Sequence, residues 1–133
     1  MIASTNSSGS DVMRTKVLVV DDDPLSVEFL RISLTEEGFQ VSTARSCAEA
    51  VSGVSHNPPD VIITDISLPD GSGIDLIRAI KSQRKVSAIS ISGYQLCDMP
   101  KGSRQIFDRE LTKPVDMTQL IRSVREIAGP VPS

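Results

Sequence analysis

The alternation of short apolar runs with longer segments of helical period constrains the fold of this chain more than any other feature. Strand-like runs are expected at residues 16–20, 39–43, 61–64, 86–91 and 106–112. The run at 61–64 (VIIT) is wholly β-branched and is expected to be the central strand. Such runs, separated by amphipathic helices, are typical of a parallel sheet that helices cover on both faces.

Local signals place the helices between these runs. Asp23 can cap a helix start, Pro24 fits its first turn and Gly38 ends it, while Ser72 is expected to cap a later helix. The residues expected to face the core are Val27, Leu30, Leu34, Cys47, Ala50, Val51, Val54, Ile74, Ile77, Ile80, Met117, Leu120, Ile121, Val124 and Ile127. Five strands and five helices with right-handed crossovers predict an α/β, flavodoxin-like doubly wound (βα)5 fold with strand order 2-1-3-4-5.

Composition excludes several classes of function. No apolar run approaches the roughly 20 residues that a membrane helix needs. The formal net charge is -3 and there is no strongly basic run, so the chain lacks the electrostatic footprint of a nucleic-acid-binding protein. One Tyr, three Phe and no Trp offer no stacking platform for single strands. We therefore expect a cytoplasmic protein that neither spans a membrane nor binds nucleic acid directly.

The length of 133 residues fits one domain with a substantial core. Residues 1–14 lack a basic start followed by an apolar stretch, so they do not resemble a secretory signal, and their Ser, Thr, Asn and Gly content predicts a disordered leader. The domain is expected at residues 15–129, with a short tail at 130–133. Cys47 and Cys97 have no partners at metal-ligand spacing and are expected to be reduced thiols.

Polar side chains follow the expected strands at the points where the strands end. Asp21 and Asp22 follow the first strand, Asp65 the third, Ser92 the fourth and Lys113 the fifth. Because ligands of doubly wound sheets bind beyond the carboxyl ends of the strands, we expect these residues to converge on one crevice. Three clustered carboxylates repel one another and favour a hard, oxygen-binding cation, which indicates Mg²⁺. A metal ion, an ammonium and a hydroxyl also supply the charge neutralisation on which phosphoryl transfer depends.

Each of these residues carries little weight alone. Three aspartates after a strand are also expected of a capped helix start, and Lys113 alone is most often a surface lysine. His56, in an expected loop, is interpreted as a solvent-exposed residue, so the chain offers no phosphohistidine of its own. Neither G-x-G-x-x-G nor G-x-x-x-x-G-K-[ST] occurs, so Gly71 and Gly73 do not indicate a nucleotide site. The complete set of residues, rather than any one of them, indicates the chemistry.

The segments LVVDDDP, IITDISLPDGSG, SISG and LTKP, in this order and at these spacings, resemble the response-regulator receiver family over residues 16–128. The resemblance implies that Asp65 is the phosphoacceptor. It also implies that Asp22 binds the metal directly and that Asp21 holds it partly through water. The main-chain carbonyl of Ser67 would complete the protein's metal ligands.

The same resemblance assigns roles to the later motifs. The Ser92 hydroxyl would contact the phosphoryl group, and Lys113 would be the ion-pairing lysine, joined to Pro114 by a cis bond. A histidine kinase or a phosphotransfer protein would donate the phosphoryl group, and the signal would pass to an unknown downstream protein through the face of helix 4, strand 5 and helix 5. Such a domain catalyses only its own phosphorylation and dephosphorylation, and is a monomer or a phosphorylation-dependent dimer.

Two alternatives remain open. A haloacid-dehalogenase-like phosphatase also uses a strand-end Asp nucleophile, and Asp21 with Asp23 would form its D-x-D pair. Such an enzyme needs a further acidic pair after the lysine, where only Asp116 and Glu126 remain. The other alternative is a receiver-like interaction module that is never phosphorylated, against which the intact Asp and Lys set argues.

The sequence departs from the family pattern in two places. Glu110 stands where many receivers carry a switch aromatic, and an ionised glutamate is expected to stay at the surface, because burying it without a partner costs several kcal/mol. Pro100 and Gly102 interrupt the expected fourth helix, so phosphorylation is expected mainly to order residues 94–108.

Tyr94 is expected near the site mouth, where its bulk would slow hydrolysis of the phosphorylated aspartate. Because the chain ends at Ser133, we expect a stand-alone regulator or an excised receiver without an output domain.

Overall fold

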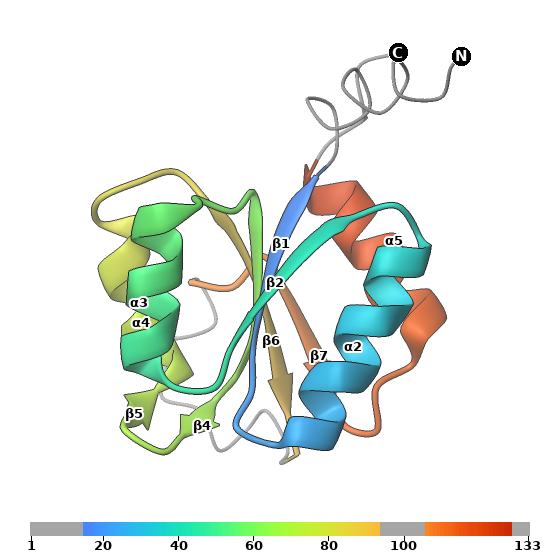
Figure 1. The fold of residues 1–133 in the computed structure, drawn as a ribbon, viewed down its shortest axis with the longest axis horizontal. Coiled ribbons are helices and arrows are strands. Elements are labelled where there is room, and N and C mark those ends of the chain that lie inside the picture. The colour runs from blue at the N-terminus through green and yellow to red at the C-terminus, as the bar shows by residue number, and fades with distance from the viewer. Residues whose placement is uncertain (1–14, 94–105, 129–133) are drawn as a thin grey trace.

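The computed structural model describes residues 15–93 and 106–128, in which strands and helices alternate along the chain (Figure 1). The elements are β1 (Lys16–Val20), α2 (Pro24–Glu36), β2 (Gln40–Ala44), α3 (Cys47–His56), β3 (Val61–Asp65), β4 (Ser67–Leu68), β5 (Gly71–Ser72), α4 (Gly73–Lys81), β6 (Ser87–Ser92), β7 (Arg109–Thr112) and α5 (Met117–Ala128). Five strands form one parallel sheet in the order β2-β1-β3-β6-β7. The predicted doubly wound α/β fold and its strand order are confirmed.

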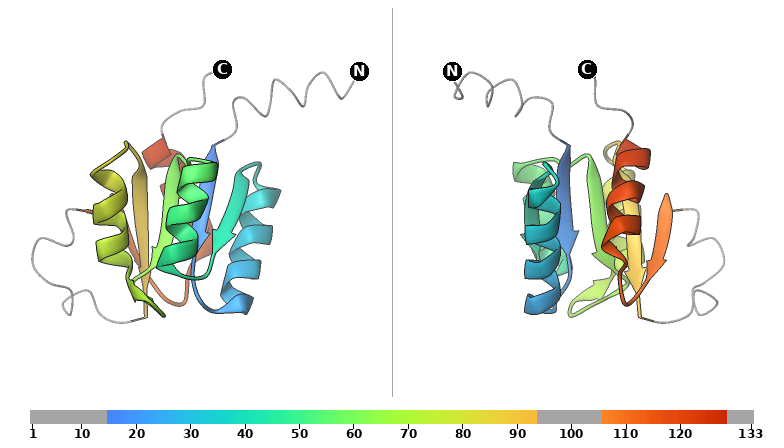
Figure 2. Two further views of the ribbon diagram at one scale, coloured as in Figure 1. Left: turned by 60° about the vertical axis from the view of Figure 1, so that its left-hand side comes forward. Right: turned by 90° about the vertical axis from the view of Figure 1, so that its right-hand side faces the viewer.

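The sheet is buried between two layers of helices. Helices α3 and α4 cover one face, and α2 and α5 cover the other, as the views in Figure 1 and Figure 2 show. Side chains alternate along each strand between two separate cores, so that Leu18 and Ile62 pack with α3 and α4 while Val19 and Ile63 pack with α2 and α5. The central strand β3 is paired on both sides, by β1 and by β6. This double pairing holds its carboxyl end in a fixed place.

The predicted helix boundaries follow from local capping chemistry. The Asp23 carboxylate accepts a hydrogen bond from the Leu25 amide (3.2 Å), and Pro24 is the first helical residue of α2. Gly38, just beyond that helix, has a φ of 97°, a conformation that disfavours any other residue type. Ser72 caps α4 by accepting a hydrogen bond from the Ile74 amide (3.0 Å). All of these expectations are confirmed.

Several element boundaries differ from the predicted ones because long-range pairing decides them. The second strand begins at residue 40 rather than 39, where the Gln40 amide donates to the Thr15 carbonyl (2.9 Å). The fifth strand is confined to Arg109–Thr112, because its ladder with β6 starts only where Arg109 faces Ile89. Phe107, outside the strand, is buried in the core.

Helix α3 contains two further corrections. Val51 was expected to face the core, but 48% of its surface is exposed, because Ala50 and Val54, four residues apart, take the inward positions. His56 was expected in a loop, but it is the last residue of the helix and its Nδ1 contacts the Ser52 carbonyl (2.9 Å). His56 is exposed, as expected.

The segment after β3 forms a short antiparallel hairpin of β4 and β5, where only turn chemistry was predicted. In Figure 1 this hairpin lies at the end of the sheet to which the strand arrows point. The expected fourth helix and Tyr94 lie outside the described residues. Among residues 15–93 and 106–128, no helix is long and apolar enough to cross a membrane.

Candidate functional site

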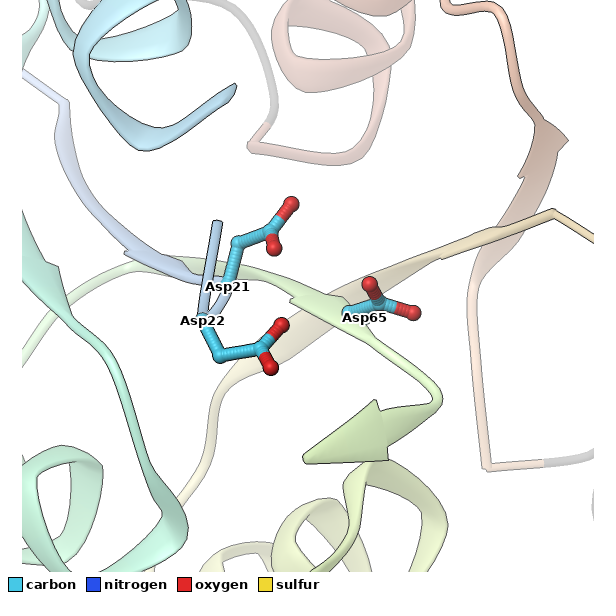
Figure 3. A group of neighbouring side chains, drawn as sticks. All are labelled: Asp21, Asp22 and Asp65. Carbon is cyan, nitrogen blue, oxygen red and sulfur yellow. The ribbon is translucent and has the colours of Figure 1, made fainter. Parts of the chain in front are cut away.

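Three aspartates meet beyond the carboxyl ends of two neighbouring strands. Asp21 and Asp22 directly follow β1, and Asp65 is the last residue of β3. One carboxylate oxygen from each of the three lies within 4.8 Å of those of the other two. Figure 3 shows the three side chains side by side at this edge of the sheet. Parallel pairing of β1 with β3 brings these residues, over 40 positions apart in the chain, into one cluster.

Lys113 supplies the positive charge of the site. Its Nζ lies 2.9 Å from Asp65 Oδ2 and 3.9 Å from Asp21 Oδ2. The residue directly follows β7, and its amide donates to the Ser92 carbonyl (2.8 Å), which extends the strand pairing to the site. The bond between Lys113 and Pro114 is cis, as the family resemblance implied.

Ser92 and Ser67 complete the predicted set. Ser92 is the last residue of β6 and only 5% exposed, whereas Ser67 lies exposed at the start of β4. A pocket of about 450 Å³ is lined by Asp22, Asp65, Ile66, Ser67, Ser92, Gly93 and Lys113. With Asp21 in the adjoining carboxylate cluster, the fold brings all six predicted site residues to one edge of the sheet.

The carboxylates are incompletely neutralised. Burial raises the pKa of Asp21, and the charges of Asp65 and Asp22 add to that rise, against the opposing effects of the Asp23 amide and Lys113. Burial alone would lower the pKa of Lys113, but its hydrogen bond to Asp65 and the nearby negative charges raise it instead. Three carboxylates and one ammonium give a formal charge of -2. A divalent cation would balance this charge.

We expect Asp21→Asn to stabilise the metal-free protein by about 1 kcal/mol at pH 7. Because the pKa of Asp21 is raised on folding, the ionised carboxylate opposes folding increasingly as the pH rises above the unfolded value of about 4. The amide removes this charge and still provides an oxygen for the Asp23 amide, which donates to Asp21 Oδ1 (3.0 Å). Urea unfolding in EDTA measures the effect, and the gain should disappear near pH 3.

The matched control for this prediction is Asp75→Asn. It removes one negative charge from an exposed position in the first turn of α4. No gain in unfolding free energy is expected there, because Asp75 accepts a hydrogen bond from Arg78 (3.2 Å) in open solvent. A variant of Asp21 that is less stable than the wild type at pH 7 would contradict the account.

The loop after Asp65 is held by contacts that the sequence did not reveal. Ser67 donates its amide to Asp65 Oδ1 (3.4 Å), and the Thr64 hydroxyl donates to the Asp65 carbonyl (2.9 Å). The Gly73 amide closes the loop by donating to the Ile66 carbonyl (2.7 Å). A Cβ at Gly73 would lie 2.2 Å from the Asp65 carbonyl oxygen. LPDGSG identified a turn, but nothing in it revealed that this glycine lies against the backbone of Asp65.

Glu110 differs from its predicted place at the surface. Its side chain is partly buried, and its Oε2 atom is wholly buried. Strand β7 pairs with β6 so that Glu110 faces Ser90, a completely buried residue. This register, set by the parallel ladder, directs Glu110 inward even though the residue is ionisable.

The sequence model of the response regulator receiver domain matches residues 17–125. The transcriptional regulatory protein KdpE of Mycobacterium tuberculosis is 37% identical over 112 residues, which cover 84% of this chain and 50% of the relative. An uncharacterized 14.6 kDa protein of Leptolyngbya boryana is 35% identical over 114 residues, covering 83% of this chain and 87% of that protein. This chain therefore spans about half the length of KdpE but most of the length of the second relative.

Solved receiver domains have the same fold. The receiver domain of a Francisella response regulator is 29% identical with a TM-score of 0.78, and the match covers 86% of this chain and 97% of that one. A CheY-like receiver domain of Methylobacillus flagellatus is 26% identical with a TM-score of 0.79, covering 86% and 98% of the two chains. With the family match extending over most of its length, this chain belongs to the response regulator receiver domains of two-component signalling systems.

Proposed function

We propose that this receiver domain accepts a phosphoryl group on Asp65 from a phosphohistidine donor, in a reaction that depends on Mg²⁺. The observation that carries the proposal is the position of Asp65, between two other carboxylates and the Lys113 ammonium at 2.9 Å, on the wall of an open pocket. Carboxylates form acyl phosphates as covalent intermediates in several classes of phosphoryl transfer. The donor would be a histidine kinase or a phosphotransfer protein.

The residues of the pocket have separate tasks in this transfer. A carboxylate oxygen of Asp65 forms a bond to phosphorus while the phosphorus–nitrogen bond of the donor breaks, and the imidazole leaves with that electron pair. Lys113 carries a positive charge beside the accepting group, where it would stabilise the negative charge of the phosphoryl oxygens. Ser92, at the end of β6, would donate its hydroxyl to one of these oxygens.

The donor set fits Mg²⁺. The carboxylates of Asp21, Asp22 and Asp65 and the Ser67 carbonyl would hold it, and all of these are the oxygen ligands that a hard divalent cation prefers. The bound ion would neutralise the formal charge of -2 and so allow an anionic donor to approach. Asp21 accepts a hydrogen bond from the Asp23 amide, and Asp65 accepts one from Lys113 Nζ. These two bonds hold the carboxylates in place before the ion binds.

The test of the proposal is the intact mass of the protein after incubation with Mg²⁺ and acetyl phosphate. One phosphoryl group should be added, and EDTA should prevent the addition. If the chain is instead a receiver-like module that is never phosphorylated, its mass should stay unchanged with and without EDTA. A wild-type protein that stays unmodified would therefore reject the proposed function.

We expect Asp22→Ala to weaken Mg²⁺ binding at least about tenfold, because even residues that only orient metal ligands contribute about 10- to 100-fold. Asp22 is exposed, so its loss should leave the core intact. Titration calorimetry measures the affinity. Asp75→Ala, which removes an acid of α4 that does not line the pocket, should bind Mg²⁺ as the wild type does. Equal affinities for Asp22→Ala and wild type would reject Asp22 as a ligand.

Two hydrogen bonds to Asp23 argue against the phosphatase alternative. That enzyme class would need Asp23 to act together with Asp21 at the site. The Asp23 carboxylate instead accepts hydrogen bonds from the Leu25 amide (3.2 Å) and the Ser26 hydroxyl (2.9 Å) in the first turn of α2. Asp23 therefore serves the helix start, which leaves the phosphoacceptor function as the better supported one.

A further inference from the structure

The carboxylate of Asp70 joins the hairpin after Asp65 to a helix that is distant in the chain. Asp70 lies between β4 and β5. Its Oδ1 accepts a hydrogen bond from the Cys47 amide (2.7 Å), and its Oδ2 accepts one from the Ala48 amide (3.0 Å). These two amides belong to the first turn of α3, 22 and 23 residues earlier in the sequence. With one amide on each oxygen, the orientation of the carboxylate is defined.

Helix α3 has its own caps besides Asp70. The Ser46 hydroxyl accepts a hydrogen bond from the Glu49 amide (3.1 Å), and Glu49 in turn accepts one from the Arg45 amide (3.1 Å). Asp70 adds acceptors for the amides of residues 47 and 48, which a helix cannot satisfy internally. The negative charge also lies at the positive end of the helix dipole. The hydrogen bonds from Cys47 and Ala48 lower the pKa of Asp70, so the carboxylate is charged at neutral pH.

The hairpin that Asp70 anchors also carries part of the phosphoryl site. Ser67, which lines the pocket, is paired with Ser72 across the two strands, and Leu68 is paired with Gly71. Asp70 occupies the turn between them. A displacement of this turn therefore moves both strands, including Ser67, relative to Asp65.

Close packing reinforces this connection between helix and hairpin. A Cβ placed on Gly71 would lie 3.3 Å from the Cys47 Sγ, tighter than an ordinary van der Waals contact. The same sulfur lies 3.9 Å from the Ser72 carbonyl oxygen. The hairpin thus lies directly against the first turn of α3, with Asp70 as its polar attachment.

We propose that Asp70 is a positioning residue for the phosphoryl site, because it fixes the hairpin that presents the Ser67 carbonyl and amide. This inference rests on the proposed function of Asp65 and Mg²⁺, and adds to it a residue that touches neither. Through the Asp70 side chain, the first turn of α3 helps to hold the hairpin at the proposed metal site.

The experiment compares Asp70→Ala with Ser46→Ala. Both variants remove a cap from the same end of α3, but only the first removes the link to the hairpin. Both should lower Tm. Only Asp70→Ala should accelerate hydrogen exchange in residues 67–72 of the metal-free protein. Only Asp70→Ala should also weaken Mg²⁺ binding, measured by calorimetry, by about tenfold, which is the effect of losing a residue that orients metal ligands.

Asp70→Asn provides a second, milder variant. It keeps one acceptor for an α3 amide and should fall between wild type and Asp70→Ala in both measurements, which also preserves the test if Asp70→Ala does not fold. The inference would be overturned if the Asp70 variants had exchange rates in residues 67–72 and Mg²⁺ affinities within twofold of those of Ser46→Ala. A wild type that neither binds Mg²⁺ nor gains a phosphoryl group would instead overturn the proposed function. The exchange data would still test whether Asp70 anchors the hairpin.

Discussion

Asp65→Asn is expected to abolish phosphorylation, so that its intact mass stays unchanged in Mg²⁺ and acetyl phosphate while the wild type gains one phosphoryl group. An amide is not a nucleophile that can form the acyl phosphate. The substitution keeps the size of the side chain. Lys113 Nζ and the Ser67 amide now donate to different oxygens of Asp65, and the one oxygen of asparagine can still accept from Lys113. The loss should therefore be chemical rather than structural.

The control for this experiment is Asp60→Asn, at the opposite end of the same strand. Asp60 directly precedes β3 and accepts a hydrogen bond from the Lys16 amide (2.8 Å), far from the pocket. This variant should be phosphorylated as the wild type is. If Asp65→Asn gains a phosphoryl group under the same conditions, the group is on another residue and the assignment of Asp65 fails.

The convergence of the three aspartates could be predicted because it depends on a local sequence pattern and on a general property of parallel sheets. Strand ends are marked by the change from apolar runs to polar residues, as at Asp21 and Asp65, and a parallel sheet places all such ends at one edge. Neither step needs any knowledge of side-chain contacts. The positions of Ser92 and Lys113 beside Asp65 follow in the same way from the pairing of β6 with β7.

The support of the site could not be predicted, because it depends on contacts between distant segments. Asp70 resembles an ordinary turn residue, and its bonds to the Cys47 and Ala48 amides exist only once α3 packs beside the hairpin. The partial burial of Glu110 has the same origin. Its charge predicted exposure, but the register of β7 against β6 places it opposite the buried Ser90.

Residues other than the six predicted site residues can therefore determine whether the site forms, and Gly73 is the strongest case. A Cβ at this position would lie 2.2 Å from the Asp65 carbonyl oxygen and 3.1 Å from the Thr64 hydroxyl oxygen. The first of these atoms belongs to the backbone of a doubly paired strand, so it cannot move aside without disturbing β3. The Gly73 amide is also fixed by its hydrogen bond to the Ile66 carbonyl (2.7 Å).

We expect Gly73→Ala to lower the free energy of unfolding by about 3 kcal/mol, at the upper end for an overpacked site. This corresponds to a fall in Tm of about 10 °C for a domain of this size. The greater helix propensity of alanine, worth about 1 kcal/mol, is too small to offset the clash. Urea unfolding at pH 7 measures the change, and the remaining folded protein should accept a phosphoryl group more slowly, because Asp65 must shift.

Gly53→Ala makes the same chemical change in the middle of α3 and provides the matched control. A Cβ there meets no atom within 4 Å, so the substitution should stabilise the protein by about 0.5–1 kcal/mol through the lower backbone entropy of the unfolded chain. The two variants should thus differ in sign, because helix propensity favours alanine at both positions while only Gly73 lies against the Asp65 carbonyl. If Gly73→Ala were as stable as the wild type, residues 65 and 73 would have to lie farther apart than in the structure, and the close packing of α4 against β3 would be rejected.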